Sequence, residues 1–201
     1  METNISILDK LSPKERVEAV LEEAENPVLT TNFRPFEAAI LHLVTDVRPD
    51  IPVIWCDTGY NTESTYRHAQ VLIEFLQLNI RLYTPRHTAA YRSVFLGQPE
   101  MGTREFDEFT EQVKLEPFRR AMSEMAPDLW FTNLRKGQTA LRDSLGIASY
   151  TKDRVLKISP FYDFTDDDLQ LYLSDHGLPN ESDYHDPTKV LSDRECGLHL
   201  T

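Results

Sequence analysis

The stretch Ile51-Pro52-Val53-Ile54-Trp55-Cys56 is rich in β-forming residues and almost entirely apolar. A strand that is buried on both faces has this composition, and such strands are typical of parallel sheets covered by helices. The stretch ends in the turn Asp57-Thr58-Gly59-Tyr60, and a helix is predicted from there to about Leu76. This order of buried strand, turn and helix therefore predicts an α/β protein in which the strand lies inside the sheet.

The same alternation of strand and helix extends along the rest of the chain. Further strands are predicted at 28–31, 79–83, 129–132 and 155–158. Helices are predicted from a capped start at Ser12 to about Asn26, then at 36–47, 117–125 and 165–176, with short helices and loop over 85–110. We therefore expect an α/β fold, with a single doubly wound, mostly parallel five-stranded sheet and helices on both faces.

The length and the patterning divide the chain into three regions. With 201 residues, the chain is long enough for one domain with a real core. We expect an N-terminal helical segment over 1–26, an α/β core over 27–177, and a C-terminal region over 178–201. The last region is polar and lacks strong periodicity, so we expect it to end in a mobile tail.

Charge and composition restrict the classes of partner. The net charge of −12 argues against binding to nucleic acid or to an anionic membrane surface. No run approaches the roughly 18 apolar residues of a membrane span, and the N-terminus lacks the features of a secretory signal. With two cysteines, the expected compartment is the reducing cytoplasm. An anionic ligand would need a local cluster of basic residues.

Three predicted strand ends carry polar residues, and ligands of open α/β sheets bind at such ends. Thr30, Thr31, Asn32 and Arg34 follow the first strand and form either an anion cradle or a simple cap and turn. Asp57, Thr58 and Gly59 form either a ligand-binding turn or a plain entry into the next helix. The run Leu134-Arg135-Lys136-Gly137-Gln138, with Arg142, is the densest cationic segment, and we favour a phosphate or sulfate site there over a solvated loop.

The two cysteines have different surroundings. Cys56 ends the apolar strand and is most simply a small buried residue. Cys196 has Arg194 and His199 nearby, which would favour a thiolate, although a lone cysteine near a chain end is a weak signal. Two cysteines cannot hold a four-iron cluster, and the histidines do not have metal-ligand spacing, so we expect no metal and no bound cofactor.

Several of these segments together resemble one family, the phosphoadenosine phosphosulfate (PAPS) reductases of the PP-loop, adenine-nucleotide α-hydrolase-like fold. The most specific is Arg194-Glu195-Cys196-Gly197-Leu198-His199, which resembles the C-terminal cysteine motif of the family. The others are 51–60, Leu41-His42-Leu43-Val44, Trp130-Phe131 leading into 134–138 with Arg142, and 160–177. The resemblance covers most of the chain from about Val28 onward, so 27–177 would be the nucleotide-binding core.

The resemblance implies thioredoxin-dependent reduction of PAPS to sulfite and adenosine 3′,5′-bisphosphate, in assimilatory sulfate reduction and cysteine biosynthesis. The Cys196 thiolate would attack the sulfur, and thioredoxin or glutaredoxin would then release sulfite from the Cys196 S-sulfonate. His199 and Arg194 would act beside Cys196, and the tail would close over the substrate and swing out to the reductant. Thr30, Thr31, Asn32 and Phe33 would line the nucleotide and phosphate cradle, Asp57, Thr58 and Gly59 would lie near adenosine, and Arg135, Lys136, Gln138, Arg142 and Arg194 would hold phosphate and sulfate.

The chain departs from the family pattern in two places. Thr30-Thr31-Asn32 replace the usual serines, and Arg34-Pro35 stand where a glycine region is usual, so Arg34 either supplies charge or obstructs the phosphate. The segment between Gly177 and Arg194 is short for a lid, and Asp186-Pro187-Thr188-Lys189 is taken as its remnant. Relatives that use adenosine phosphosulfate (APS) usually carry extra cysteine pairs for an iron–sulfur cluster, and this chain lacks such pairs. The resemblance therefore implies PAPS rather than APS as the substrate.

Two alternatives to a PAPS reductase stay open. One is a PP-loop enzyme that uses ATP, such as an adenylyltransferase, which would not need Cys196. The other is an adenine-nucleotide-binding protein that has lost catalysis. The resemblance also leaves open whether the protein is a monomer or a homodimer.

Overall fold

The computed structural model describes residues 5–188 of the chain, except residues 96, 98 and 139. Within this range, strands form one sheet in the order β3-β2-β1-β4-β6-β5. Their bounds are β1 (Pro27–Thr31), β2 (Pro52–Cys56), β3 (Asn79–Tyr83), β4 (Leu129–Phe131), β5 (Ala148–Tyr150) and β6 (Leu156–Ile158). Neighbouring strands from β3 to β6 are parallel, and β5 pairs antiparallel with β6 at the edge.

The predicted doubly wound, mostly parallel sheet is confirmed, and its strand count is corrected from five to six. The additional strand is β5, which contains the residues Ala148, Ser149 and Tyr150. None of these residues is fully buried, so the strand lacks the apolar run that marks β2. These residues form a strand because they pair with β6. The pattern of residues along the chain does not reveal this pairing, so the strand was not predicted.

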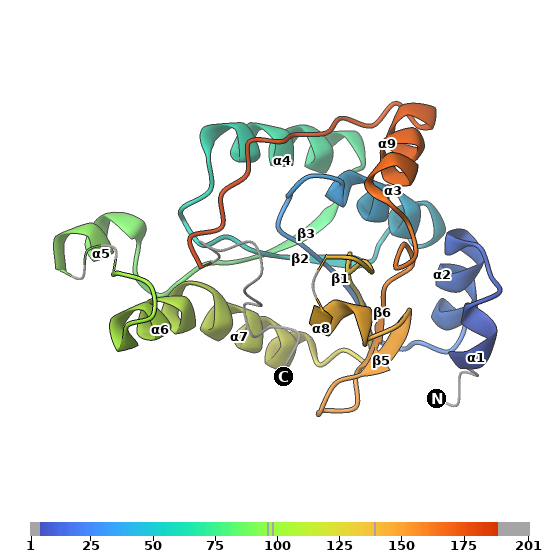
Figure 1. Ribbon diagram of the computed structural model, residues 1–201, viewed down its shortest axis with the longest axis horizontal. Helices are drawn as coiled ribbons and strands as arrows, with labels where there is room; N and C mark the ends of the chain where they lie inside the picture. The colour runs from blue at the N-terminus through green and yellow to red at the C-terminus, as the bar shows by residue number, and fades with distance from the viewer. Residues whose placement is uncertain (1–4, 96, 98, 139, 189–201) are drawn as a thin grey trace.

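Helices lie on both faces of the sheet, with α3, α4 and α9 on one side and α7 on the other (Figure 1). Their bounds are α1 (Ile5–Leu8), α2 (Pro13–Leu21), α3 (Glu37–Val47), α4 (Glu63–Phe75), α5 (Ala89–Phe95), α6 (Arg104–Thr110), the π-helix η1 (Glu111–Leu115), α7 (Glu116–Met125), α8 (Ala140–Asp143) and α9 (Asp166–Asp175). The helices α5 and α6 occupy the region predicted as short helices and loop. In the part of the chain that the structure describes, no helix is long and apolar enough to pass through a bilayer.

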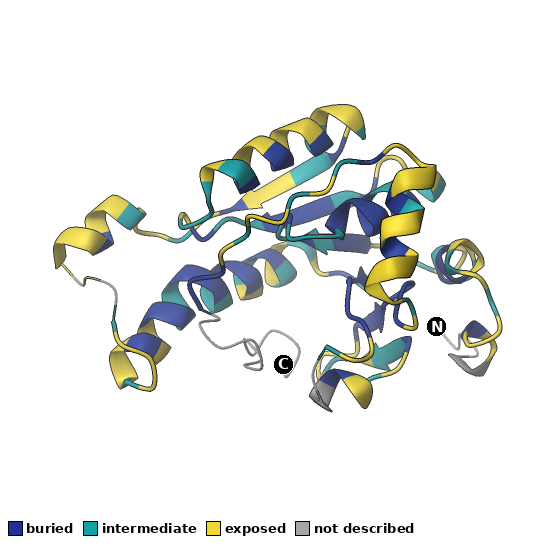
Figure 2. Cartoon of the chain, turned by 45° about the horizontal axis from the view of Figure 1, so that its top comes forward, coloured by how far each residue is buried: buried dark blue, intermediate teal, exposed yellow. Residues whose placement is uncertain are grey.

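Successive side chains of the central strands point to opposite faces of the sheet and contribute to two separate hydrophobic cores. Leu29, Val53 and Phe131 belong to the larger core, together with residues of α2, α3 and α9. Their strand neighbours, such as Ile54 and Trp130, belong to the smaller core, which packs against α7. A strand presents successive side chains to opposite faces, so only a strand with apolar residues on both faces can serve both cores. Figure 2 shows these strands as the most buried part of the molecule.

A buried arginine joins the N-terminal helices to the segment before α9. The helix α2 begins with the predicted capping box, in which Ser12 Oγ accepts from the backbone N–H of Glu15. About one turn further along α2, Arg16 is 2% exposed and its guanidinium donates to the carbonyl oxygens of Leu8 and Pro160 at 3.0 and 2.7 Å. It also forms an ion pair with Asp163 at 2.6 Å. Three of the four donor contacts therefore hold α2 against Pro160 and Asp163, which lie more than a hundred positions later in the chain.

The helix α9 packs on α3 and leads into an extended segment. His42 Nδ1 lies 2.9 Å from the hydroxyl of Tyr172, and His176 stacks on the Tyr172 ring with 4.2 Å between ring centroids. From Leu178 to Thr188 the chain has no helix or strand and runs back across α4 toward the centre of the molecule (Figure 1). We call residues 178–188 the strap.

Three groups of hydrogen bonds hold the strap to the body of the protein. The carbonyl oxygen of Asp183 accepts from the hydroxyls of Thr62 and Thr65 at 2.9 and 3.0 Å, at the start of α4. The backbone N–H of Phe36 donates to Asn180 Oδ1 at 2.9 Å. Further along, Tyr184 and Asp186 contact the site described next.

Candidate functional site

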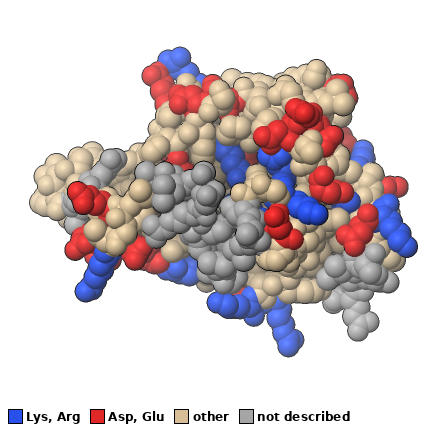
Figure 3. Space-filling model, in the orientation of Figure 1, with Lys and Arg blue, Asp and Glu red and all other residues tan. Residues whose placement is uncertain are grey.

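A cavity lies at the carboxyl ends of β1, β2 and β4, where the strand order reverses between β1 and β4. Ligands of open α/β sheets bind at such a point because the connections leave on opposite sides and open a crevice. The lining residues come from strands and the loops after them, from the helices α3, η1, α7 and α8, and from the strap: Thr30, Thr31, Asn32, Arg34, Glu37, Ile54, Cys56, Lys114, Phe118, Trp130, Thr132, Asn133, Leu134, Arg142, Tyr184 and Asp186. Basic side chains are visible near the centre of this face, between acidic ones (Figure 3).

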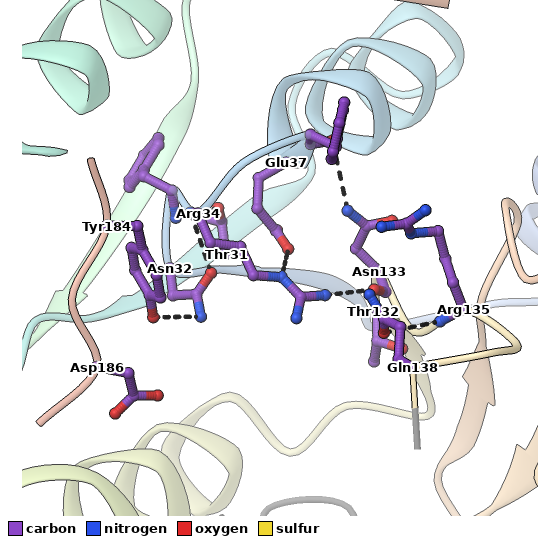
Figure 4. Close-up of polar contacts among 12 residues, drawn as sticks. Thr31, Asn32, Arg34, Glu37, Thr132, Asn133, Arg135, Gln138, Tyr184 and Asp186 are labelled. Carbon is purple, nitrogen blue, oxygen red and sulfur yellow. Dashed lines mark hydrogen bonds and ion pairs between the residues drawn. The ribbon is translucent and has the colours of Figure 1, made fainter. Parts of the chain in front are cut away.

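The loop after β1 provides one wall of the cavity. Thr30 Oγ1 accepts from Trp130 Nε1 at 2.9 Å, and Asn32 Nδ2 donates to the hydroxyl of Tyr184 at 2.8 Å (Figure 4). The backbone N–H groups of Phe33 and Arg34 donate to Thr31 Oγ1 and Asn32 Oδ1 within the loop. An anion in the predicted cradle would therefore compete with these side-chain oxygens for backbone donors.

Phe33 lies beneath the loop rather than at the cavity surface. It is fully buried, and its ring packs edge-on against Trp55 with 4.9 Å between ring centroids. Its φ of 53°, with the φ of 67° at Phe36, bends the chain sharply into α3. Residues other than glycine rarely adopt this left-handed region, so packing of the aromatic rings holds the turn. The assignment of Phe33 to the substrate cradle stays a prediction.

Arg34 lines the cavity and is held at its side by two neighbours. Its Nε donates to Glu37 Oε1 at 2.9 Å, and its Nη2 donates to the carbonyl oxygen of Asn133 at 2.6 Å (Figure 4). Glu37 is buried, and burial raises its pKa even though Arg34, Asn133 and Thr31 oppose the shift. The sequence analysis did not include Glu37, because a glutamate at the start of a helix is usual and gives no sign of burial.

We predict that Arg34→Ala lowers the free energy of unfolding by about 2 kcal/mol, because it leaves the buried Glu37 carboxylate without its cation. Adding Glu37→Gln to Arg34→Ala should recover most of this loss, because the amide needs no counter-charge. Urea unfolding of the single and double variants measures the coupling. If the double variant loses as much as the sum of the single variants, the two side chains do not act as a pair.

The cationic run after β4 is divided by the fold. Arg142 is buried and lines the cavity, and it donates to Gln138 Oε1. Arg135 turns toward α9 instead, where it forms an ion pair with Asp166 at 2.6 Å and lies over the Phe36 ring. Lys136 is exposed. The structure therefore brings Arg142 to the cavity and leaves Arg135, Lys136 and Gln138 outside its lining, and their role toward phosphate or sulfate stays a prediction.

The turn after β2 lies outside the cavity lining, and its polar side chains form hydrogen bonds with the turn itself and with the start of α4. The Asp57 carboxylate accepts from the N–H of Gly59 at 2.9 Å, from Asn61 at 2.8 Å and from the Tyr66 hydroxyl at 2.9 Å. Thr58 Oγ1 accepts from the N–H of Tyr60 at 3.3 Å. These contacts fit the alternative of a helix-entry turn, while a role of Asp57, Thr58 and Gly59 beside adenosine stays a prediction.

The cavity contains a cation that the sequence analysis did not identify, Lys114 of η1. Its side chain is 9% exposed, and its ammonium group donates to Asp186 and, at 3.3 Å, to Thr188 Oγ1. Burial works to raise the pKa of Asp186, but the charge of Lys114 and the hydrogen bonds from Lys114 and Thr188 outweigh it, so the pKa is lowered. A single lysine among glutamates carries no signal by itself, and no sequence rule predicts a π-helix.

The cysteine inside the cavity is a poor nucleophile. Cys56 is half-buried, and burial raises the pKa of its thiol to about 12, against the opposing charges of Lys114 and Arg120. The thiol therefore stays protonated near neutral pH, and the thiolate is the reactive form. Among the described residues, no group of three His, Cys, Asp or Glu side chains could hold a metal ion. The predicted catalytic residues Cys196, His199 and Arg194 lie outside the described residues.

The sequence comparisons with known proteins agree on one family. The family model of the phosphoadenosine phosphosulfate reductase domain matches residues 26–186. A phosphoadenosine 5′-phosphosulfate reductase of Xylella fastidiosa is 40% identical over 174 residues, which cover 86% of this chain and 73% of that protein. One from Xanthomonas campestris is 37% identical, with 96% of this chain and 89% of that protein covered.

A solved structure shows the same fold. The phosphoadenylyl-sulfate (PAPS) reductase of Candida auris, in a phosphate complex, superposes with a TM-score of 0.76 at 21% identity and covers 90% of this chain and 89% of that one. The sequence comparisons span both the sheet and the strap, and they agree with the family expected from the cysteine motif. The chain therefore belongs to the phosphoadenosine phosphosulfate reductase family.

Proposed function

We propose that this protein reduces PAPS to sulfite and adenosine 3′,5′-bisphosphate, in assimilatory sulfate reduction. The observation that carries the proposal is the cavity at the strand-order reversal of a PAPS reductase family member, with Lys114, Arg34 and Arg142 in its wall. These three cations suit an anionic nucleotide, in a chain whose net charge of −12 would otherwise repel it.

The chemistry proceeds in two steps. The Cys196 thiolate attacks the sulfur of PAPS, the bond between sulfur and the phosphate oxygen breaks, and adenosine 3′,5′-bisphosphate leaves with that oxygen. A thiolate of reduced thioredoxin or glutaredoxin then attacks the Cys196 sulfur, and sulfite leaves with the electron pair of the S–S bond. The second thiol of the reductant resolves the mixed disulfide, so the reductant supplies two electrons. The high pKa of the Cys56 thiol supports Cys196 as the nucleophile.

The proposal assigns a task to each region of the chain. Residues 27–177 bind the nucleotide, and residues 178–201 act as lid remnant and catalytic tail, with His199 and Arg194 beside the reacting thiol. The N-terminal helical segment over 1–26 supports the core through Arg16. A reducing cytoplasm suits an enzyme whose catalytic thiol must be regenerated in each cycle.

The test is an assay of sulfite release with thioredoxin, thioredoxin reductase and NADPH, with PAPS and APS titrated side by side. We expect sulfite from PAPS at a higher kcat/KM than from APS. Without reductant, intact-protein mass spectrometry should show one added sulfonate group on the peptide that contains Cys196. Pyrophosphate release from ATP without sulfite would favour the ATP-using alternative, and nucleotide binding without either product would favour a protein that has lost catalysis.

A further inference from the structure

The ammonium group of Lys114 and the carboxylate of Asp186 meet inside the cavity. Their side chains are 9% and 6% exposed, and both residues line the cavity wall. Lys114 comes from η1 and Asp186 from the strap, 72 positions later in the chain. A cation that faces the proposed nucleotide site is therefore neutralised by the protein's own carboxylate.

The carboxylate is itself positioned by the end of the strap. Asp186 Oδ1 accepts from both the N–H and the hydroxyl of Thr188, at 3.0 and 2.7 Å, and Thr188 Oγ1 also contacts Lys114. One acidic side chain thus organises a compact turn around the ammonium group. Burying such a pair gives little net stability, because desolvating the two charges offsets most of their attraction. Stability alone is therefore a weak reason for the pair.

The strap also restricts the space at the site. Tyr184 reaches across to Asn32 of the loop after β1, so the strap contacts both walls of the cavity (Figure 4). The cavity volume is about 120 Å³, whereas pockets for small molecules usually measure roughly 300–1,000 Å³. A nucleotide that carries phosphate groups needs more room than this cavity offers, and the strap forms one part of its wall. Its contact with Lys114 also requires a place that Asp186 occupies.

We propose that Asp186 is an internal carboxylate that substitutes for the anionic group of the ligand on Lys114, and that nucleotide binding displaces it and releases the strap from Tyr184 to Thr188. The inference rests on the proposed function, because it takes the ligand to be an anionic adenine nucleotide. A phosphate or sulfate group can replace the carboxylate because it presents more acceptor oxygens to the same ammonium group. The two states of Lys114, paired with Asp186 or with ligand, exclude one another.

This competition links the site to the C-terminal tail. Cys196 follows Thr188 by eight positions, so the residues that Asp186 anchors are those from which the tail starts. A ligand that removes Asp186 from Lys114 therefore releases residues 184–188, which precede the segment that contains Cys196. The displaced carboxylate moves into water, where it is well solvated. The main unfavourable term in the free energy of the exchange is therefore the loss of the strap contacts.

The first test compares the affinity for adenosine 3′,5′-bisphosphate of the full chain and its Asp186→Asn variant by calorimetry. Removing the competing charge should tighten binding by about tenfold, and the salt dependence of binding should increase because Lys114 is then unpaired. The matched control is Asp183→Asn, which makes the same charge change on an exposed strap residue and should alter the affinity by less than about twofold. Unchanged or weaker binding by folded Asp186→Asn overturns the inference.

A second measurement on the unaltered protein keeps the inference testable if Asp186→Asn folds poorly. Hydrogen exchange of a peptide that covers residues 183–188 should become faster when the bisphosphate saturates the protein, while exchange in the loop after β1 becomes slower. Slower exchange in the strap on ligand binding overturns the inference alone. If the unaltered protein does not bind the bisphosphate at all, the proposed function fails, and the inference fails with it.

Discussion

Cys196→Ser is expected to lower sulfite release from PAPS by about 10⁴-fold or more, while the affinity for adenosine 3′,5′-bisphosphate stays within about twofold. A serine hydroxyl is not ionised near neutral pH, and it cannot form the sulfur–sulfur bond that the reductant later breaks. Binding should persist because the cations of the cavity, including Lys114 and Arg142, lie on η1 and α8 and are unchanged in this variant. Steady-state sulfite assays and calorimetry measure the two quantities.

The second cysteine provides the matched control for this variant. Because burial raises the pKa of the Cys56 thiol to about 12, Cys56→Ser should still acquire one sulfonate group on Cys196 when PAPS is added without reductant. Cys196→Ser should acquire none. Sulfite release that survives Cys196→Ser, or an adduct found on Cys56, would show that the two-step mechanism is wrong.

The largest expected change in stability follows from Arg16→Met, which should lower the free energy of unfolding by about 4 kcal/mol. Methionine retains much of the apolar volume of arginine but removes every donor. The carbonyl oxygens of Leu8 and Pro160 then lose their guanidinium partner in a buried position, and Asp163 loses its ion pair. Burial of carbonyl oxygens without hydrogen-bond donors is costly, so the folded state is destabilised.

Lys14→Met on the same helix is the matched control. Lys14 pairs with Asp46 at 2.7 Å, but both side chains are about half exposed, so its loss should cost less than about 0.5 kcal/mol. Chemical denaturation of both variants, with m-values compared, gives the two free energies. A loss of under 1 kcal/mol for Arg16→Met, with an unchanged m-value, would mean that the N-terminal helices dock through their apolar residues and not through this guanidinium.

The parts of the fold that could be predicted are those that depend on residues close together in the sequence. The strand β2 is apolar on both faces, and Ser12 with Glu15 and Thr165 with Asp168 form capping boxes that are readable from four residues each. These features depend on side-chain patterning and on backbone donors within one turn. The strand β5 depends instead on its partner β6, and its three residues carry no pattern of their own.

The candidate site was less predictable because it combines residues that lie far apart in the chain. Polar residues after β1 and Arg142 after β4 were identifiable, since strand ends of a parallel sheet meet at one edge. Lys114, Asp186 and Tyr184 reach the same cavity from a π-helix and from an extended segment, two structures without a sequence period. Glu37 was hidden by its usual position at a helix start, where nothing indicates that the fold buries it.

The π-helix η1 also makes the packing of α6 sensitive to the number of residues that η1 contains. Bonding from residue i to i+5 accommodates one residue more than an α-helix would, so the helix on its N-terminal side is turned by about 100° relative to an uninterrupted one. This offset places Phe109 of α6 against Tyr60, with 5.4 Å between ring centroids. Loss of any one residue between Glu111 and Leu115 would restore regular winding and swing Phe109 away. The number of residues in this segment therefore matters for the packing of α6 independently of their identity.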